Sequence, residues 1–372
     1  MKVGIVSKWI ASGQAVVARH IRSALDELGH ETFVLARPGS GPRAQQAATA
    51  SAGSVDPVWD QPGVTEASEH HVPLAEYEDW VRANGIEAIL CDENYQFDEI
   101  HHLREQGVRT IGRFVWEYFS SEYVHGARTA FETIYSLTRC ERDRYRELGI
   151  ASPYVQWGIH PELLEAASDV SVSPPSEGFL TDRPEGAVVF YFPGSFLGRR
   201  KPVRKVVKAF GRAKGDHLRL VISAQVPNKD DFLREAAAAD PRIELALEDD
   251  PEDVHRARFA SCDVCLAPSR WEGLGLPLFE ATAFGLPIVT NDKPPMSEMV
   301  LDGRSGILIP SVPNGEARSG ITAWDPEPGA LTAAIERLGD RAELERMREG
   351  VAELRELRAW RHTVEGFGEL LG

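Results

Sequence analysis

The residues best suited to chemistry lie in one short segment, residues 268–280, which reads Pro-Ser-Arg-Trp-Glu-Gly-Leu-Gly-Leu-Pro-Leu-Phe-Glu. Two carboxylates, Glu272 and Glu280, stand on either side of a glycine-rich turn that opens a predicted helix. Gly273 and Gly275 allow the backbone to bend tightly and to approach a ligand, and the amides at a helix start bind anions. The pattern therefore predicts a phosphate held between two carboxylates that accept hydrogen bonds from sugar hydroxyls.

A second segment, residues 194–201, follows an apolar strand-like run and carries Arg199, Arg200 and Lys201. Cations are unfavourable at the N-terminus of a helix, so their position here favours an anionic partner. Planar guanidinium forks and an ammonium suit a diphosphate, and preplaced cations stabilise a leaving group that develops negative charge. The alternative for both segments is a solvated, charged surface without a ligand.

Alternating strands and helices must position these segments, and such alternation predicts parallel sheets built from βαβ units. In the first half, strands at 3–7, 32–36, 88–91, 110–115 and 133–136 alternate with helices at 15–28, 74–84, 100–106, 127–131 and 139–148. In the second half, strands at 188–192, 218–223, 243–247, 264–267, 287–290 and 306–309 alternate with helices at 203–213, 229–239, 251–261 and 278–284. Helices at 331–339, 343–357 and 362–371 close the chain. Ligands of open parallel sheets bind beyond the carboxyl ends of the strands, where both segments lie.

The predicted fold class is α/β, with two Rossmann-like doubly wound domains facing a cleft. The first domain spans residues 1–168, a linker 169–178 has the composition of a loop, and the second domain spans 179–352. Residues 38–71 are rich in Pro, Gly, Ala and Ser, and we interpret them as a long excursion or lid.

The composition narrows the choice of partners. The chain has 372 residues, 41 Lys and Arg, 57 Asp and Glu, and a formal net charge of −16. Because phosphate backbones require basic surface, this balance argues against nucleic acid and anionic membranes as main partners. No run approaches the roughly 18 apolar residues of a membrane span, and the N-terminus resembles a strand rather than a cleavable signal. We therefore expect a cytoplasmic protein with no transmembrane segment.

The positions of cysteine and histidine predict no metal or redox site. Cys262 and Cys265 share a predicted strand, where residues three apart face opposite sides, so we interpret them as buried core thiols. His70 and His71 lie in the 38–71 excursion and are interpreted as solvated loop residues.

The chain resembles the GT-B glycosyltransferases, specifically the large retaining group called family 4 or group 1. The Glu-x7-Glu pattern of that group fits Glu272 and Glu280. Further matching segments are residues 158–160, 263–269, 281–289, 297–298, 302–308 and 359–361. The resemblance implies a donor-binding second domain, an acceptor-binding first domain and a helix within 353–372 that crosses back to the first domain.

The resemblance also implies a role for each matching position. Glu272 would contact hydroxyls of the donor sugar, Glu280 would bind the ribose, and Arg200 and Lys201 would hold the departing diphosphate. The other donor-binding positions are Gly13, the single glycine where many members have a pair, Ser195 and Arg199 in the basic loop, and Gly273, Leu274, Gly275 and Leu276 at the helix start. The cations would stabilise the negative charge of the diphosphate, so we expect no obligate metal and no cofactor beyond the nucleotide diphosphate sugar itself.

Two departures from the family pattern bear on activity. Ser195 stands where many members have an arginine, for which Arg199 would compensate. Many members carry a histidine after the fourth strand of the first domain, where this chain has Trp116 and Glu117. The nearest histidine, His125, lies too far along the chain, so Glu117 is the natural substitute as a polar, basic group.

We therefore predict a retaining hexosyltransferase whose catalytic groups are Glu272, Lys201, Arg200 and Glu117. Its donor is GDP-mannose or a UDP-sugar, and its acceptor is a hydroxyl on a sugar, a glycan, a lipid-linked or a small molecule. Peripheral membrane contact stays open. Two alternatives remain: a nucleotide-sugar-binding protein without transfer activity, and a nucleotide-sugar epimerase on the same fold.

Overall fold

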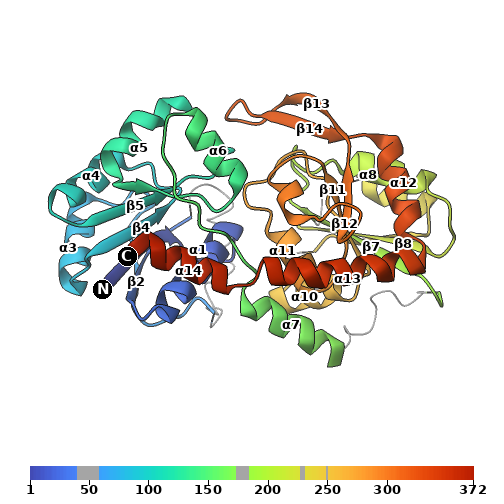
Figure 1. The fold of residues 1–372 in the computed structure, drawn as a ribbon, viewed down its shortest axis with the longest axis horizontal. Coiled ribbons are helices and arrows are strands. Elements are labelled where there is room, and N and C mark those ends of the chain that lie inside the picture. The colour runs from blue at the N-terminus through green and yellow to red at the C-terminus, as the bar shows by residue number, and fades with distance from the viewer. Residues whose placement is uncertain (40–57, 173–183, 227–230, 249) are drawn as a thin grey trace. The chain divides into compact units, whose positions relative to one another are not determined.

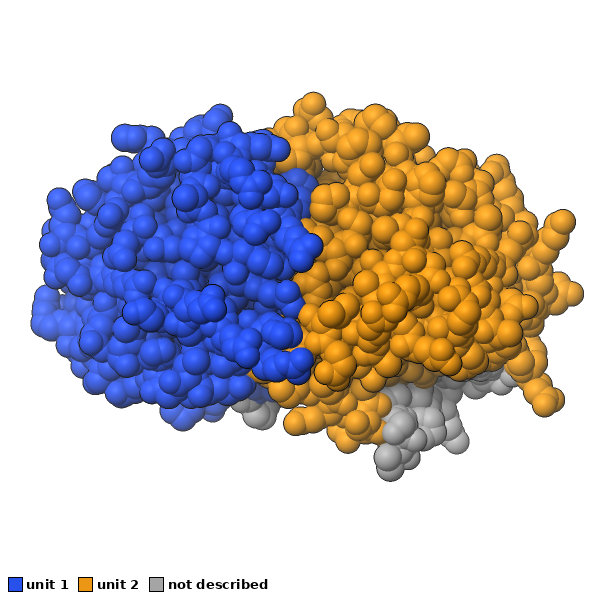
Figure 2. Space-filling view, in the orientation of Figure 1, with its two compact units in different colours: residues 1–157, 361–372 blue, residues 158–360 orange. Residues whose placement is uncertain are grey.

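Two six-stranded parallel sheets, each in its own unit of the chain, organise the structure (Figure 1). The structure is a computed structural model that describes residues 1–39, 58–172, 184–226, 231–248 and 250–372. Unit 1 contains Met1–Trp157 and Arg361–Gly372, and unit 2 contains Gly158–Trp360 (Figure 2). Both α/β units therefore have the predicted doubly wound class.

The sheet of unit 1 has the strand order β3-β2-β1-β4-β5-β6. Its strands are β1 (Lys2–Lys8), β2 (Glu31–Arg37), β3 (Val64–Glu66), β4 (Ala88–Asp92), β5 (Arg109–Arg113) and β6 (Thr133–Ile134). Its helices are α1 (Gly13–Glu27), α3 (Leu74–Asn84), α4 (Phe97–Glu105), η1 (Ser121–Tyr123), α5 (Val124–Ala130), α6 (Arg139–Glu147) and α14 (Arg361–Leu371). The central strand β4 is buried along its whole length, as expected where helices cover both faces of a sheet.

The sheet of unit 2 has the order β12-β11-β10-β7-β8-β9, with a separate antiparallel pair, β13 and β14. Its strands are β7 (Val188–Ser195), β8 (Leu218–Ala224), β9 (Ile243–Ala246), β10 (Val264–Leu266), β11 (Ile288–Asn291), β12 (Gly306–Ile309), β13 (Ser311–Glu316) and β14 (Thr322–Pro326). Its helices are α7 (Pro161–Val172), α8 (Val203–Arg212), α9 (Asp231–Ala239), α10 (Glu252–Ala260), α11 (Leu276–Ala283), η2 (Met296–Met299), α12 (Pro328–Leu338) and α13 (Arg341–Leu357).

The two sheets share one topology, and that topology places the predicted segments. In unit 2 the chain adds strands β8 and β9 on one side of β7, then returns to add β10, β11 and β12 on the other. The switch point therefore lies between β7 and β10, which pair in register at Val264 with Phe190 and Cys265 with Tyr191. Ligands of open α/β sheets bind at such switch points. The basic segment follows β7 and the glutamate segment follows β10.

The last helix belongs to unit 1, as predicted. Arg109 on β5 donates hydrogen bonds of 2.8 Å and 2.7 Å to the carbonyl oxygens of Leu370 and Leu371. The rings of Tyr135 and Phe367 meet edge-on with centroids 5.6 Å apart. The predicted crossing segment 353–372 therefore contains the end of α13 in unit 2 as well as all of α14.

Two other predictions differ from the structure. The described part of the 38–71 excursion contains a strand that the sequence did not indicate, because β3 extends the sheet beside β2, and the Trp9 indole donates a 2.9 Å hydrogen bond to the Trp59 carbonyl. Residues 40–57 lie outside the described residues. The units divide after Trp157 rather than at the predicted residue 168, because α7 packs on α10 in unit 2. The predicted linker 169–178 begins inside α7 and lies outside the described residues from 173 onward.

The remaining sequence-level interpretations concern buried thiols and membrane spans. Cys262 and Cys265 are free and buried, which confirms that they are core thiols. Among the described residues, no helix is both long and apolar enough to cross a membrane.

At the carboxyl end of β4, Glu93 links the end of this strand to the residues that follow β5 in unit 1. Its φ of 54° lies in the left-handed region, which is uncommon for residues other than glycine. Its carboxylate accepts hydrogen bonds from the Val115 backbone amide and, at 3.4 Å, from the Tyr95 hydroxyl. Burial and the neighbouring charge of Asp92 raise the pKa of Glu93 to about 8. Glu93 thereby fixes the start of the loop that leads to Glu117.

We expect the raised pKa of Glu93 to make folding stability fall as pH rises. The unfolded carboxyl loses its proton near pH 4.5, whereas the folded carboxyl keeps it to about 8. Between these values the unfolded state binds fewer protons, so the free energy of unfolding decreases with pH. Urea denaturation at several pH values between 5 and 8 should show a shallower decrease in Glu93→Gln than in wild type. Equal slopes in the two proteins would contradict the assignment.

Candidate functional site

Glu272 and the cations Arg200 and Lys201 form one buried ion cluster in unit 2. Lys201 Nζ lies 2.7 Å from Glu272 Oε1 and donates a 3.0 Å hydrogen bond to Ser269 Oγ. Arg200 donates a hydrogen bond to the other carboxylate oxygen of Glu272. The side chains of Lys201 and Glu272 are 4% and 5% exposed, whereas that of Arg200 is 33% exposed. The structure therefore joins Glu272 to two consecutive cations that lie 72 and 71 positions earlier in the sequence.

The charges in this cluster decide the protonation state of Glu272. Burial acts to raise the pKa of Glu272, but the charges of Lys201 and Arg200 outweigh burial and hold that pKa below its ordinary value. At neutral pH the group is a carboxylate, which only accepts hydrogen bonds. A ligand hydroxyl is a donor that such a carboxylate can bind. The exposed edge of Arg200 is the part of the cluster that can reach a ligand anion.

The glycine-rich turn before α11 provides backbone amides next to this cluster. Gly275 is the N-cap residue of α11, and its φ of 82° requires the left-handed region that glycine adopts without strain. No side chain caps the helix at this position, so the amides at the start of α11 have no partner from a capping side chain. Pro277 suits the first turn because it has no amide hydrogen to satisfy. This local geometry is that of an anion site at a helix start.

The basic loop itself leaves β7 through an irregular turn. Ser195 and Leu197 have φ values of 49° and 48°, and the register with β8 shifts between Pro193 and Ser195, the last residue of β7 that pairs with that strand. Backbone in this sparsely populated region persists only where its surroundings enforce it, and it concentrates at functional sites. Ser195 thus shapes the turn through its backbone. The side chain of Arg199 is exposed at the start of the cationic run.

Glu280 lies on α11, whereas Glu272 lies in the loop before that helix. The groups that surround Glu280 differ from those around Glu272. Burial raises the pKa of Glu280, while the nearby charges of His255 and Arg256 act in the opposite direction. His255 in turn lies 3.1 Å from the hydroxyl of Tyr191, which is buried under α10. Glu280 is therefore a partly exposed carboxyl beside the Tyr191–His255 pair rather than a member of the ion cluster.

The two remaining predicted residues, Gly13 and Glu117, belong to unit 1 and follow strands β1 and β5 of its sheet. Gly13 is the exposed first residue of α1, after β1, and Ser12 caps this helix by accepting a hydrogen bond from the Ala15 amide. Glu117 follows β5 and is 6% exposed, next to the buried Trp116. In unit 1 the switch point lies between β1 and β4, so Gly13 stands at the same topological position as the basic loop of unit 2.

Three residues of the site were not predicted from the sequence. Ser269 accepts from Lys201, while Arg270 and Asp325 form a 2.7 Å ion pair beside the cluster. Ser269 and Arg270 lie within the segment 268–280 that the sequence analysis singled out. Their position directly after β10 could therefore have indicated that they belong to the site. Asp325 lies on β14, in a hairpin that the alternating pattern of strands and helices did not indicate.

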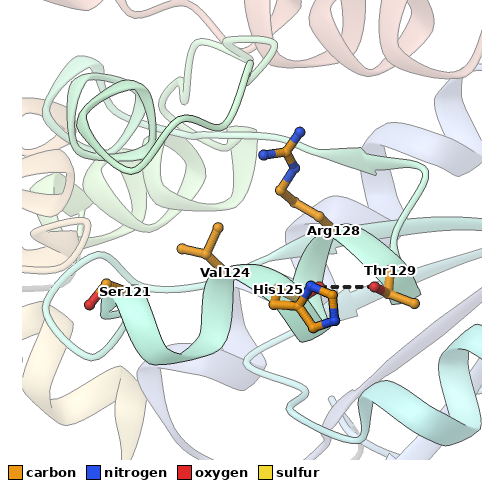
Figure 3. A pocket seen from close by; sticks show the side chains of 5 residues that line it. All are labelled: Ser121, Val124, His125, Arg128 and Thr129. Atoms are coloured by element: carbon orange, nitrogen blue, oxygen red, sulfur yellow. Dashed lines mark hydrogen bonds between the residues drawn. The ribbon is translucent and has the colours of Figure 1, made fainter.

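A surface pocket of about 430 Å³ lies in unit 1, on η1 and α5 (Figure 3). It is lined by Ser121, Val124, His125, Arg128 and Thr129, and Thr129 donates a 3.0 Å hydrogen bond to the His125 carbonyl. His125, which the sequence placed too far along the chain to replace the usual histidine, therefore lines this pocket on a helix. The lining contains an imidazole and a guanidinium but no carboxylate, unlike the cluster around Glu272.

Comparison with known proteins finds glycosyltransferases similar to the second half of the chain. The model of the glycosyl transferases group 1 family matches residues 187–338, which contain the ion cluster and Glu280. The D-inositol 3-phosphate glycosyltransferase of Nocardia farcinica is 30% identical over 190 residues, 47% of this chain and 39% of that protein. The matches span less than half the length of the curated relatives.

The similarity of the fold extends over the whole chain. A glycosyltransferase structure from Rickettsia africae aligns with a TM-score of 0.73 at 10% identity and covers 99% of this chain and 97% of that one. Anabaena HepE, in complex with UDP-glucose, aligns with a TM-score of 0.68 at 12% identity, covering 100% and 99% of the two chains. Residues 187–338 therefore match the model of the glycosyl transferases group 1 family, and the two Rossmann-like domains of the chain have the GT-B fold.

Proposed function

We propose that this protein transfers a hexose, with retention, from a nucleotide diphosphate sugar to a hydroxyl acceptor. The observation that carries the proposal is the buried cluster of Glu272 with Lys201 and Arg200 at the switch point of unit 2. Cations and a carboxylate fixed in one cluster match the two demands of this reaction. The diphosphate leaves with negative charge, and the sugar must be oriented through its hydroxyls.

The cations would act on the leaving group. Arg200, the more exposed of the two, would bind a phosphate oxygen directly, and the amides before α11 would complete the phosphate site. Lys201 would stabilise the charge that develops as the bond to the sugar breaks. Because its ammonium is held by Ser269 and Glu272, little reorganisation accompanies the reaction. With cations doing this work, we expect no obligate metal.

The carboxylates would orient the donor. Glu272, held ionised, would accept from sugar hydroxyls, and Glu280 would bind the ribose of the UDP or GDP moiety. In unit 1, Glu117 would serve as the polar group beside the reacting centre and Trp116 as a surface for a sugar. The departing phosphate itself would help to remove the acceptor proton. Retention would require the acceptor to approach the sugar from the side on which the diphosphate leaves.

Donor turnover separates this proposal from its alternatives. A transferase slowly hydrolyses its donor when no acceptor is present, a binding protein protects it, and an epimerase converts the sugar without releasing the nucleotide. The first experiment therefore incubates the protein with candidate donors and follows nucleotide release. Intact donor throughout would favour a binding protein, and a changed sugar on intact donor would favour an epimerase.

A panel of UDP, GDP, ADP and TDP should identify the base. A nucleoside diphosphate at about 100 times its dissociation constant adds about 2.7 kcal/mol to folding stability, which thermal unfolding detects. We expect one base to raise the midpoint, with the same rise in EDTA. Absence of any shift would exclude the proposed donor site, and loss of the shift in EDTA would exclude the metal-independent form of the proposal.

Lys201→Ala should reduce the rate of transfer by about 100-fold or more, because one preplaced cation at the leaving group is lost. Lys208→Ala is the matched control, since Lys208 is an exposed lysine on α8 in the same charged stretch. Thermal unfolding without donor checks that both variants fold. Full turnover in Lys201→Ala would show that this loop does not hold the diphosphate.

Glu280→Ala should weaken nucleotide binding, because a hydrogen-bond acceptor for the ribose is removed. We expect the dissociation constant of the nucleoside diphosphate to rise about tenfold, which calorimetric titration measures. Glu345→Ala, which removes an exposed carboxylate on α13, is the control. Unchanged affinity in Glu280→Ala would remove Glu280 from the nucleotide site.

A further inference from the structure

A second buried carboxylate, Asp325 on β14, gathers cations beside the Glu272 cluster. Its Oδ1 lies 2.7 Å from Arg270 Nε and its Oδ2 lies 3.0 Å from Lys205 Nζ. Asn314, on the facing strand β13, donates a further hydrogen bond to Oδ2. The Asp325 side chain is 3% exposed, so burial acts to raise its pKa, but these partners hold that pKa below its ordinary value. Asp325 is therefore a buried, ionised group with three partners, of which Arg270 is the least exposed.

Arg270 connects Asp325 to both segments of the proposed donor site. It lies two residues before Glu272, and its backbone amide donates a 2.9 Å hydrogen bond to the Arg200 carbonyl. Its guanidinium donates a 3.1 Å hydrogen bond through Nη1 to the Arg199 carbonyl. Its own carbonyl accepts a 3.0 Å hydrogen bond from the Trp324 amide, next to Asp325. Arg270 is therefore hydrogen-bonded both to the β13–β14 hairpin and to the basic loop, and it belongs to the segment that carries Glu272.

Unit 2 therefore contains two neighbouring ion clusters, each made of one buried carboxylate and two cations. In one, Glu272 binds Arg200 and Lys201, and in the other, Asp325 binds Arg270 and Lys205. Glu272 joins two neighbouring cations that precede α8, whereas Asp325 joins Lys205 on α8 to Arg270. A guanidinium is always charged and demands a partner when buried. Without Asp325 the Arg270 guanidinium would lose its carboxylate partner, and with it the support for the position from which Nη1 donates to the Arg199 carbonyl.

We propose that Asp325 is a positioning residue of the donor site, which holds the backbone of the basic loop through Arg270 and Lys205 so that Arg200 and Lys201 meet the donor diphosphate. The inference rests on the proposed function, since it takes residues 199–201 as the diphosphate loop. It makes the β13–β14 hairpin a structural part of the donor site. Asp325 itself is buried behind Arg270 and contacts no donor atom in this scheme.

The test separates phosphate binding from nucleoside binding. The probes are UDP with uridine, or GDP with guanosine, according to the base that the panel identifies. In wild type the two phosphates should increase affinity strongly over the nucleoside. In Asp325→Asn, which keeps the side-chain shape and removes the charge, we expect diphosphate affinity to fall about tenfold or more while nucleoside affinity stays within about twofold. Asp292→Asn is the control, since Asp292 is a half-buried carboxylate that pairs with Ser311 at the hairpin base.

Each outcome bears on a different claim. Equal loss of nucleoside and diphosphate affinity would mean a general structural role and would overturn the inference, as would unchanged diphosphate affinity. If wild type binds no nucleoside diphosphate, the proposed function fails before the inference is tested. If Asp325→Asn does not fold, Arg270→Lys provides the measurement, because it keeps the charge and loses the reach to the Arg199 carbonyl. Selective loss of diphosphate affinity in Arg270→Lys supports the inference, and retained affinity overturns it.

Discussion

The buried carboxylate of Glu272 is the constraint around which unit 2 is arranged. Removing a carboxylate and an ammonium from water costs several kcal/mol for each ion, which only close pairing and further hydrogen bonds offset. Lys201, Arg200 and Ser269 supply that compensation, and all three stand on loops that leave β7 and β10. The adjacent position of these two strands is therefore a requirement of the ion cluster as well as a property of the fold.

The same constraint explains the second ion cluster. Holding two cationic loops against each other brings Arg200, Lys201 and Arg270 into a small volume, where their mutual repulsion must be balanced. One carboxylate cannot pair with all three cations, and the hairpin supplies the second in Asp325. Arg270 then serves both clusters, through its side chain toward Asp325 and its backbone toward Arg200.

Sequence patterns predicted the parts of this arrangement that are local in the chain. The apolar runs of β7 and β10, the glycine turn at Gly275 and the cations of the basic loop each leave a signal within a few residues. The partnership of Arg270 with Asp325 leaves none, because its two members are brought together by tertiary structure alone. The short strand β3 was missed for a related reason, since its three residues extend a sheet edge and carry no apolar period of their own. The predicted domain limit at residue 168 followed the linker-like composition that begins there, whereas α7, which precedes most of that segment, packs on α10 in unit 2.

The chain passes from unit 1 to unit 2 at Trp157 and returns at Trp360, and the two passages lie next to each other. The Ile159 amide donates a 2.7 Å hydrogen bond to the Arg358 carbonyl, and Ile159 pairs with Ala359 as in a parallel sheet. Unit 2 is therefore one uninterrupted stretch set inside the chain of unit 1. During synthesis the ribosome therefore makes all of unit 2 before α14, which packs on α1. Unit 1, although its first residues are translated first, lacks its last helix until the whole of unit 2 has been made.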